Sequence, residues 1–189
     1  MKKYTKQYIN GEWREGKGEE LFNYNPYTGE LLYSYHASSK DDVDDAYEAA
    51  KKAQSDWEST SPEQKKSFLI KLASIFTEMQ DEIATCSVNE GGKVLSLAQF
   101  EAGECIIAIE EAIRYTSMPN GTIYPSNCPG KDVFSYREAK GVVGVISPWN
   151  MPFILASRII FPAIACGNTV VLKPSSDTPA SAFLIAEAF

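Results

Sequence analysis

The sequence predicts a mixed α/β fold, in which short N-terminal strands and a helical block precede a parallel strand–helix–strand–helix unit. Three observations lead to this prediction. Turn dipeptides separate short apolar runs near the N-terminus, apolar residues recur at helical spacing between residues 40 and 118, and two β-branched runs alternate with helical patterns in the last third. Strands that alternate with helices in this way form parallel sheets with right-handed crossovers.

The first forty residues are typical of strands joined by turns. Asn10-Gly11 lies between apolar residues in YINGEW, and this dipeptide is the strongest short signal for a β-hairpin. Asn25-Pro26 and Thr28-Gly29 separate two alternating apolar runs in LFNYNPYTGELLYSY. We therefore expect two pairs of strands before residue 40.

A helical block follows. Ser39 is in place to cap a first helix, and the SPEQ segment at residues 61–64 is a capping box for a second. The apolar stripe of the second helix continues to Ile83, Gly91-Gly92 interrupts the pattern, and a further helix is expected from about residue 94 to residue 118. We interpret the stripes of these helices as core; on the first helix the stripe consists of Val43, Tyr47, Ala50 and Trp57.

Residues 119–140 are rich in proline, glycine and asparagine and then alternate like a strand, so they mark a boundary. We expect three parts: hairpins and helices at 1–118, a linker with strands at 119–140, and a βαβα unit at 141–189. In the last part the pattern predicts strands at 142–147 and 169–172, with Gly167 as a left-handed helix cap. The final SAFLIAEAF lacks a helix-ending signal, so we expect this unit to be truncated.

Composition excludes several classes of function. Acidic residues outnumber basic ones 25 to 18, which argues against a nucleic-acid partner. The N-terminus has no apolar signal-peptide core and no apolar run reaches 18 residues, so a cytosolic protein without a membrane partner is expected. Four cysteines without a C-x-x-C pair, and a single histidine, argue against a metal site and favour buried, reduced thiols.

Polar segments follow both strands of the last unit. SPWN comes after the first strand and KPSSDTP after the second, and open parallel sheets bind ligands at the carboxyl ends of their strands. If the strands are neighbours, Asn150 and Lys173 project from one rim. The Asn150 amide could stabilise an oxyanion, and the Lys173 ammonium could bind ribose or phosphate. The hydroxyls of Ser175, Ser176 and Thr178 lie near a predicted helix N-terminus that could attract anions.

Other readings of these segments stay open. Asparagine before a helix is often its N-cap, Lys-Pro after a strand is commonly a solvated turn, and Asp177 or Thr178 could cap a helix that begins near Pro179. No G-x-G-x-x-G sequence follows either strand. The residues alone therefore predict part of an α/β domain with a candidate nucleotide rim.

Several motifs together resemble the NAD(P)-dependent aldehyde dehydrogenase family. INGEW, NPYTGE, GVVGVISPWNMP and GNTVVLKPSSDTP occur in the order found in the N-terminal part of that family, from about Tyr8 to the end of the chain. ISPWNMP and KPSSDTP resemble its benzaldehyde and vanillin dehydrogenase branch. The resemblance implies an incomplete Rossmann-like domain, NAD or NADP as cofactor, an aldehyde substrate, and a homo-oligomer formed through strands near residues 121–138.

The resemblance also implies a mechanism. In the family a cysteine attacks the aldehyde, an asparagine amide holds the thiohemiacetal oxyanion, hydride passes to the nicotinamide, and a glutamate activates water to hydrolyse the thioester. Asn150 matches that asparagine, and Lys173 matches the lysine that contacts the adenosine ribose. The cofactor-binding residues implied by the resemblance are Ser147, Pro148, Trp149, Asn150, Lys173, Pro174, Ser175 and Ser176.

Two departures from the family pattern matter. Ser176 stands where many NAD-preferring members have glutamate, with Asp177 one place later, which leaves room for NADP. None of the four cysteines matches the surroundings of the nucleophile, and Cys166 matches a packing position. The nucleophile and the glutamate base are expected beyond Phe189, so the 189-residue chain alone should be inactive. The alternative is a truncated product that at most binds a nucleotide or associates with itself.

Overall fold

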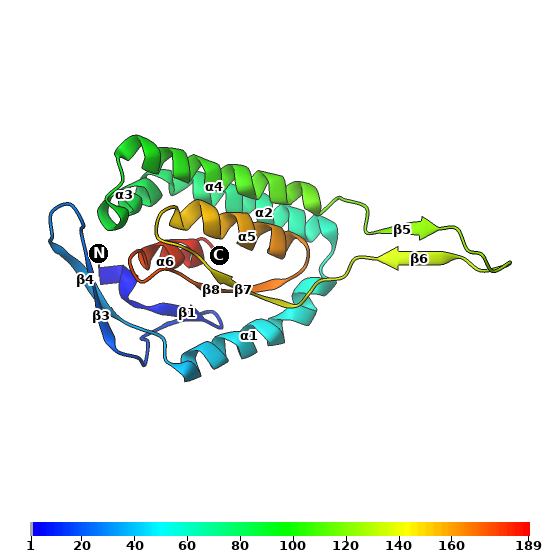
Figure 1. The fold of residues 1–189 in the computed structure, drawn as a ribbon, viewed down its shortest axis with the longest axis horizontal. Helices are drawn as coiled ribbons and strands as arrows, with labels where there is room; N and C mark the ends of the chain where they lie inside the picture. The colour runs from blue at the N-terminus through cyan, green and yellow to red at the C-terminus, as the bar shows by residue number, and fades with distance from the viewer. Residues whose placement is uncertain (1) are drawn as a thin grey trace.

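The computed structural model describes residues 2–189 as a helical body with four two-stranded sheets and one projecting arm (Figure 1). The elements, in chain order, are η1 (Lys2–Thr5), β1 (Gln7–Ile9), β2 (Glu12–Arg14), β3 (Glu20–Tyr24), β4 (Leu31–His36), α1 (Lys40–Ser59), α2 (Pro62–Glu78), α3 (Gln80–Gly91), α4 (Leu95–Tyr115), β5 (Gly121–Tyr124), β6 (Val133–Tyr136), β7 (Val142–Ile146), α5 (Pro152–Ala165), β8 (Thr169–Lys173) and α6 (Ala180–Glu187).

Both N-terminal strand pairs form as predicted. β1 pairs with β2 and β3 with β4, each antiparallel. Asn10 and Gly11 have φ angles of 54° and 81°, the left-handed values that a two-residue hairpin turn requires. In the second turn, the Asn25 side-chain oxygen accepts hydrogen bonds from the N–H groups of Tyr27 and Thr28, so asparagine chemistry fixes this connection too.

The helical block confirms the predicted caps and corrects two details. Capping boxes are present at Ser39 and Ser61. The apolar stripe predicts one helix through Ile83, but the helix is broken at Met79, whose ψ of 0° ends α2 and starts α3. Val43 and Tyr47, predicted as core, are each 42% exposed. Helix α1 packs mainly on the β7–β8 pair and on β1, and these short strands leave both side chains partly uncovered.

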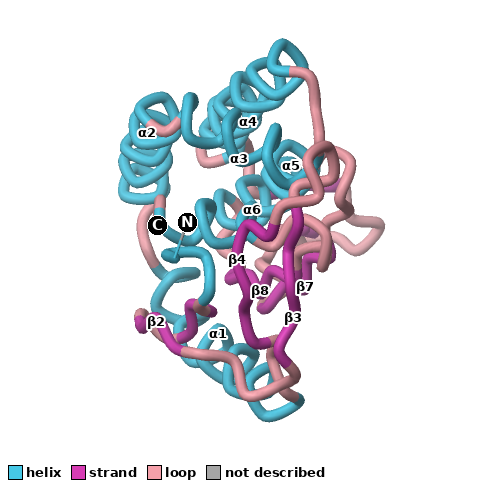
Figure 2. Tube along the Cα trace, turned by 90° about the vertical axis from the view of Figure 1, so that its left-hand side faces the viewer, coloured by secondary structure: helices cyan, strands magenta, loops and turns pink. Residues whose placement is uncertain are grey.

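The last third forms the predicted parallel unit. β7 and β8 are parallel, in register from Val142 opposite Thr169 to Ile146 opposite Lys173. Gly167, with a φ of 84°, ends α5 in the left-handed conformation. Helices α1 and α5 lie on opposite sides of this strand pair, and α4 and α2 pack beyond α5 (Figures 1 and 2). A parallel pair covered on both faces is the arrangement expected of apolar strands.

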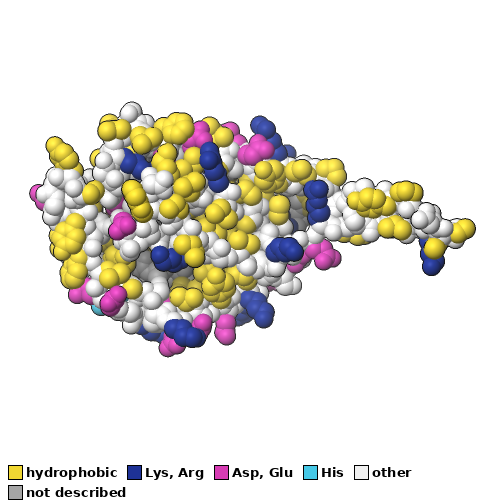
Figure 3. Space-filling model, in the orientation of Figure 1, with side chains coloured by type: hydrophobic (Ala, Val, Ile, Leu, Met, Phe, Trp, Pro, Cys, Tyr) yellow, Lys and Arg dark blue, Asp and Glu magenta, His cyan; other side chains and the backbone are white. Residues whose placement is uncertain are grey.

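One apolar core joins the helical block to this unit. Leu69, Ile109, Val145, Phe153 and Leu184, which come from α2, α4, β7, α5 and α6, are all nearly or fully buried in the same cluster. Outside it, the β5–β6 hairpin projects from the body as an arm with apolar side chains along it (Figures 1 and 3). Within residues 2–189 no helix is both long and apolar enough to cross a membrane.

Candidate functional site at the ends of the parallel strands

The structure brings the two polar segments together. Ile146 lies opposite Lys173 in the ladder, and the Ser147 N–H donates a hydrogen bond of 3.1 Å to the Lys173 carbonyl. SPWN and KPSS therefore leave the sheet side by side. Five of the eight predicted site residues are exposed, two are partly buried and Ser147 is buried; the exposed ones are Pro148, Trp149, Asn150, Lys173 and Ser176.

The Asn150 side chain does not cap the helix that follows it. The N-cap residue of α5 is Met151, and no side chain from that position caps the helix. Among residues 2–189 no hydrogen bond holds the Asn150 amide, which is exposed at the rim. Asp177 and Thr178 do not cap α6 either, because its N-cap is Pro179 and the buried Thr178 hydroxyl has no partner in the described chain. The capping alternatives raised by the sequence are therefore wrong.

A distant carboxylate caps α5 instead. Glu101 of α4 is fully buried, and its Oε1 accepts hydrogen bonds from the N–H groups of Phe153 at 2.9 Å and Ile154 at 3.4 Å. Its Oε2 accepts from the Ser87 hydroxyl at 2.9 Å and pairs with the Lys93 ammonium. Since Pro152 has no N–H, these bonds satisfy the free donors of the first helical turn.

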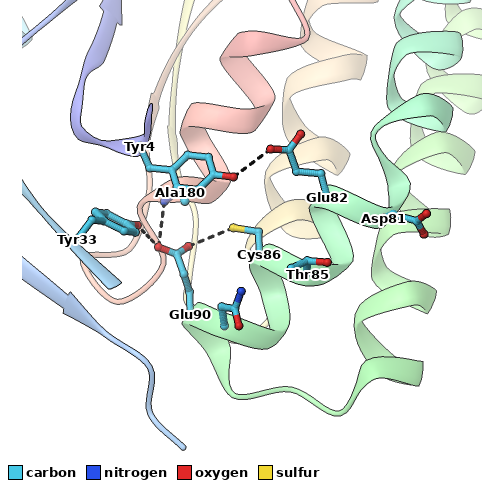
Figure 4. Close-up of a pocket in the computed structure, with 9 residues that line it drawn as sticks. Tyr4, Tyr33, Asp81, Glu82, Thr85, Cys86, Glu90 and Ala180 are labelled. Carbon is cyan, nitrogen blue, oxygen red and sulfur yellow. Dashed lines mark hydrogen bonds between the residues drawn. The ribbon is translucent and has the colours of Figure 1, made fainter. Parts of the chain in front are cut away.

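A second buried carboxylate caps α6 in the same manner. Glu90 at the end of α3 accepts from the N–H of Ala180 at 3.3 Å, from the Tyr33 hydroxyl and from the Cys86 thiol (Figure 4). Burial raises the pKa of the Glu90 carboxyl to about 7, although these three hydrogen bonds favour its charged form. The same burial, together with the neighbouring carboxylate, raises the pKa of the Tyr33 hydroxyl well above its usual value.

These two caps decide where an anion can bind. The first free N–H groups of α5 and α6 already donate to carboxylates, and the next ones in α6 donate to backbone carbonyls. A phosphate at either helix end would meet a carboxylate rather than free donors. The backbone donors at the start of α6, which the sequence suggested for an anion, are therefore already hydrogen-bonded within the chain.

Sequence reasoning missed two residues that shape this rim, Glu90 and Glu101, and a third at the opposite end of the two strands, Asn168. The Asn168 side-chain oxygen accepts from the N–H groups of Lys140 and Gly141, at 2.6 and 3.0 Å, and so fixes the entry into β7 beside β8. For Glu101 a signal existed. It falls on the buried face of α4 with Ala98, Ala102, Cys105 and Ile109, and a carboxylate on such a face needs partners.

The cysteines do not supply a nucleophile at this rim. Cys86 and Cys105 are buried, and burial raises the pKa of the Cys86 thiol well above its usual value and that of Cys105 to about 12, so both stay protonated. Cys128 and Cys166 are exposed, which corrects the expectation that all four thiols are buried and that Cys166 is a packing residue. Cys166 is exposed because it lies at the C-cap of α5, after the last buried turn.

A polar rim at the carboxyl ends of neighbouring parallel strands, flanked by crossover helices, defines the class of α/β proteins that bind ligands at the sheet edge. The comparison with known proteins makes the class specific. The sequence profile described as the aldehyde dehydrogenase family matches residues 13–189. The chain belongs to the aldehyde dehydrogenase family.

Individual relatives agree with this assignment. Vanillin dehydrogenase of Corynebacterium glutamicum is 41% identical over 182 residues, which are 96% of this chain and 38% of that protein. D-glyceraldehyde dehydrogenase (NADP(+)) of Picrophilus torridus is 34% identical, over 97% of this chain and 38% of its own length. The chain thus spans less than two fifths of the curated relatives it matches.

A solved structure matches the fold closely. The crystal structure of an NAD-dependent benzaldehyde dehydrogenase from Corynebacterium glutamicum superposes with a TM-score of 0.93 and 40% sequence identity. The match covers 98% of this chain and 42% of that one. The incomplete Rossmann-like α/β architecture predicted from the sequence is therefore confirmed, and both NAD- and NADP-dependent proteins occur among the relatives.

Proposed function

We propose that this chain forms the oxyanion-donor corner and part of the NAD(P) rim of an aldehyde dehydrogenase. The reaction is the oxidation of an aldehyde to a carboxylic acid through a thiohemiacetal and a thioester. One observation carries the proposal: in a member of this family, the Ile146–Lys173 pairing puts Asn150 and Lys173 on the same edge of the sheet.

The Asn150 amide is suited to receive a developing negative charge. It is exposed beyond the end of β7, and within the described residues it makes no hydrogen bond that a substrate oxygen would have to displace. A preorganised side-chain amide of this kind typically contributes about 100- to 1,000-fold in kcat. We assign this role to Asn150 as the catalytic residue of the chain.

The rim residues fit a dinucleotide. The Ser147 hydroxyl is buried at the strand end with no hydrogen-bond partner among residues 2–189, Trp149 presents an exposed ring, and the Lys173 ammonium is exposed beside them. NAD or NADP, when bound, supplies the hydride acceptor. Ser176 adds a hydroxyl where many NAD-preferring members have a carboxylate, which leaves room for a 2′-phosphate even though Asp177 follows one place later.

The rest of the active site must come from other residues. Since the chain spans 38% of its curated relatives, we assign the cysteine nucleophile and the glutamate base to sequence outside it. The relation to vanillin dehydrogenase supports an aromatic aldehyde as substrate. The proposal also includes a cytosolic location, and a homo-oligomer of the full-length protein formed through the exposed β5–β6 arm.

Calorimetric titration of the purified chain with NAD⁺ and NADP⁺ tests the cofactor rim. We expect binding that weakens about tenfold in Lys173→Ala, the order of a lost hydrogen bond from a charged group, and that is unchanged in the control Lys131→Ala at the tip of the arm. Binding that Lys173→Ala leaves intact would contradict the assignment. Formation of NADH or NADPH by the chain alone with vanillin would contradict the placement of the nucleophile outside it.

The role of Asn150 needs a complete active site. A chimera in which this chain replaces the corresponding 38% of the Corynebacterium vanillin dehydrogenase supplies one. We expect Asn150→Ala to lower kcat of the chimera about 100- to 1,000-fold, while Gln99→Ala, which removes an exposed amide from α4, leaves it unchanged. An active chimera that tolerates Asn150→Ala would refute the role.

The alternative, an inactive fragment that associates with itself, has its own test. Size-exclusion chromatography with light scattering measures the mass of the chain in solution. A clean monomer would count against association through the edges of the β7–β8 pair.

A further inference from the structure

The corner between β7 and α5 is held at both ends but not in its middle. At the strand end, the Ser147 N–H donates to the Lys173 carbonyl. At the helix end, the N–H groups of Phe153 and Ile154 donate to Glu101. Between these anchors the side chains of Trp149 and Asn150 are exposed. Where Asn150 points therefore depends on how firmly the two ends are fixed.

The side-chain cap of α5 comes from outside the corner. The Met151 side chain has no oxygen with which to cap α5, although its backbone carbonyl accepts from the Leu155 N–H at 3.1 Å, and Pro152 has no N–H to be capped. Glu101 replaces the missing local cap, and it is the point where four segments meet: Ser87 of α3, Lys93 of the α3–α4 connection, α4 itself and the first turn of α5.

These contacts occupy all the acceptor positions of the Glu101 carboxylate. An ionised carboxylate has about four acceptor positions, and here two N–H groups, one hydroxyl and one ammonium fill them. The Glu101 side chain is fully buried and the Lys93 side chain is 7% exposed, so bulk water has little access to the pair. Such a group fixes the start of α5 relative to α3 and α4 in both distance and direction.

We infer that Glu101 is the positioning residue of the oxyanion corner, which we define as residues 148–151. It sets the place of Asn150 through the first turn of α5 without touching the reacting atoms. The inference rests on the proposed function for its catalytic meaning, but the placement itself can be measured without any reaction.

The test compares three forms of the chain by NMR. In the double variant Glu101→Leu/Lys93→Met, apolar side chains of similar volume replace the buried pair, a change that often leaves stability unaltered. The cap is lost, however, so we expect amide exchange at Phe153 to accelerate about tenfold, the order of effect of a lost helix cap. The relaxation of the Trp149 indole and the Asn150 side-chain amide should show increased motion. Glu101→Gln keeps an acceptor and should restore much of the order.

Glu104→Gln is the matched control. Glu104 lies one turn further along α4 and pairs with Arg158 of the same helix α5, at 3.3 Å, but away from its N-terminus. We expect no change in the corner of this variant. Corner motion equal to wild type in the double variant would overturn the inference, because a role confined to stability changes the melting temperature and leaves the motion of the corner unaltered.

The wild-type chain gives a measurement that no folding defect can obscure. Its Phe153 and Ile154 amides should exchange as slowly as amides in the middle of α5, although helix-start amides ordinarily exchange fast. Fast exchange at both positions would overturn the inference. Failure of the proposed function is distinguishable: the chain would then bind neither NAD⁺ nor NADP⁺, while the corner would still loosen in the double variant.

Discussion

Replacing Glu90 by glutamine should make the stability of the chain less dependent on pH. Glu90 is 6% exposed, and burial raises the pKa of its carboxyl from 4.5 to about 7. A raised pKa means that the folded chain binds the proton more tightly than the unfolded chain does. The stabilisation is therefore complete below pH 4.5 and is lost as the pH rises to 7 and above.

The size of the effect follows from the two pKa values. The difference between 4.5 and about 7 corresponds to about 3 kcal/mol in the free energy of unfolding. Glutamine resembles the protonated carboxyl: it stays neutral, and its oxygen can still accept from the Tyr33 hydroxyl and the Ala180 N–H. Glu90→Gln should thus match wild type near pH 4.5 and exceed it by up to about 3 kcal/mol at pH 8.

Urea unfolding, followed by circular dichroism between pH 4.5 and pH 8, measures this difference directly. Glu110→Gln, on the exposed face of α4, controls for the general effect of removing one negative charge. A difference between Glu90→Gln and wild type that is the same at pH 4.5 and pH 8 would refute the reasoning, because it would show that Glu90 does not change its charge in this range.

Three further substitutions probe other parts of the fold. Burial opposes ionisation of Asp42, yet hydrogen bonds from groups that include the Lys17 N–H lower its pKa to about 2. Asp42→Asn should therefore lower the free energy of unfolding in urea by about 1–2 kcal/mol at pH 7. The loss should become smaller as the pH falls from 4 toward 2. Phe153→Ala, at a fully buried site, should cost about 3–5 kcal/mol, and a smaller loss would mean that the core collapses around it. A Cβ on Gly144 would clash with the Tyr47 hydroxyl, so Gly144→Ala should lower the melting temperature. Adding Tyr47→Phe to that variant should restore part of the lost melting temperature. A loss that Tyr47→Phe leaves unchanged would contradict this contact.

Local signals predicted most of the secondary structure. The Asn10-Gly11 turn, the capping boxes at Ser39 and Ser61, and the Gly167 cap each depend on a few adjacent residues, so the sequence displays them directly. The break at Met79 has no such signal, because methionine fits an apolar helical stripe and neither glycine nor proline marks the bend.

The candidate site was predictable only in part. The polar strand ends are adjacent in sequence to their strands, and the parallel pairing then makes them neighbours. The caps on α5 and α6 could not be placed, because Glu101 lies 52 residues before Phe153 and Glu90 lies 90 residues before Ala180. A carboxylate at a buried position indicates that partners exist, but the sequence does not say which groups they are. For Glu101 the partners are determined by the packing of α4 against α5.

The distances along the chain between these carboxylates and their helices also bear on the order of folding. Helix starts that depend on remote groups gain little from local interactions, and contacts across long chain separations form late because the loop must first close. During synthesis α3 and α4 emerge before α5 and α6, so Glu90 and Glu101 are made before the N–H groups that they bind. The first turns of α5 and α6, and with them the rim between the strands, should be among the last parts of the chain to reach their final geometry.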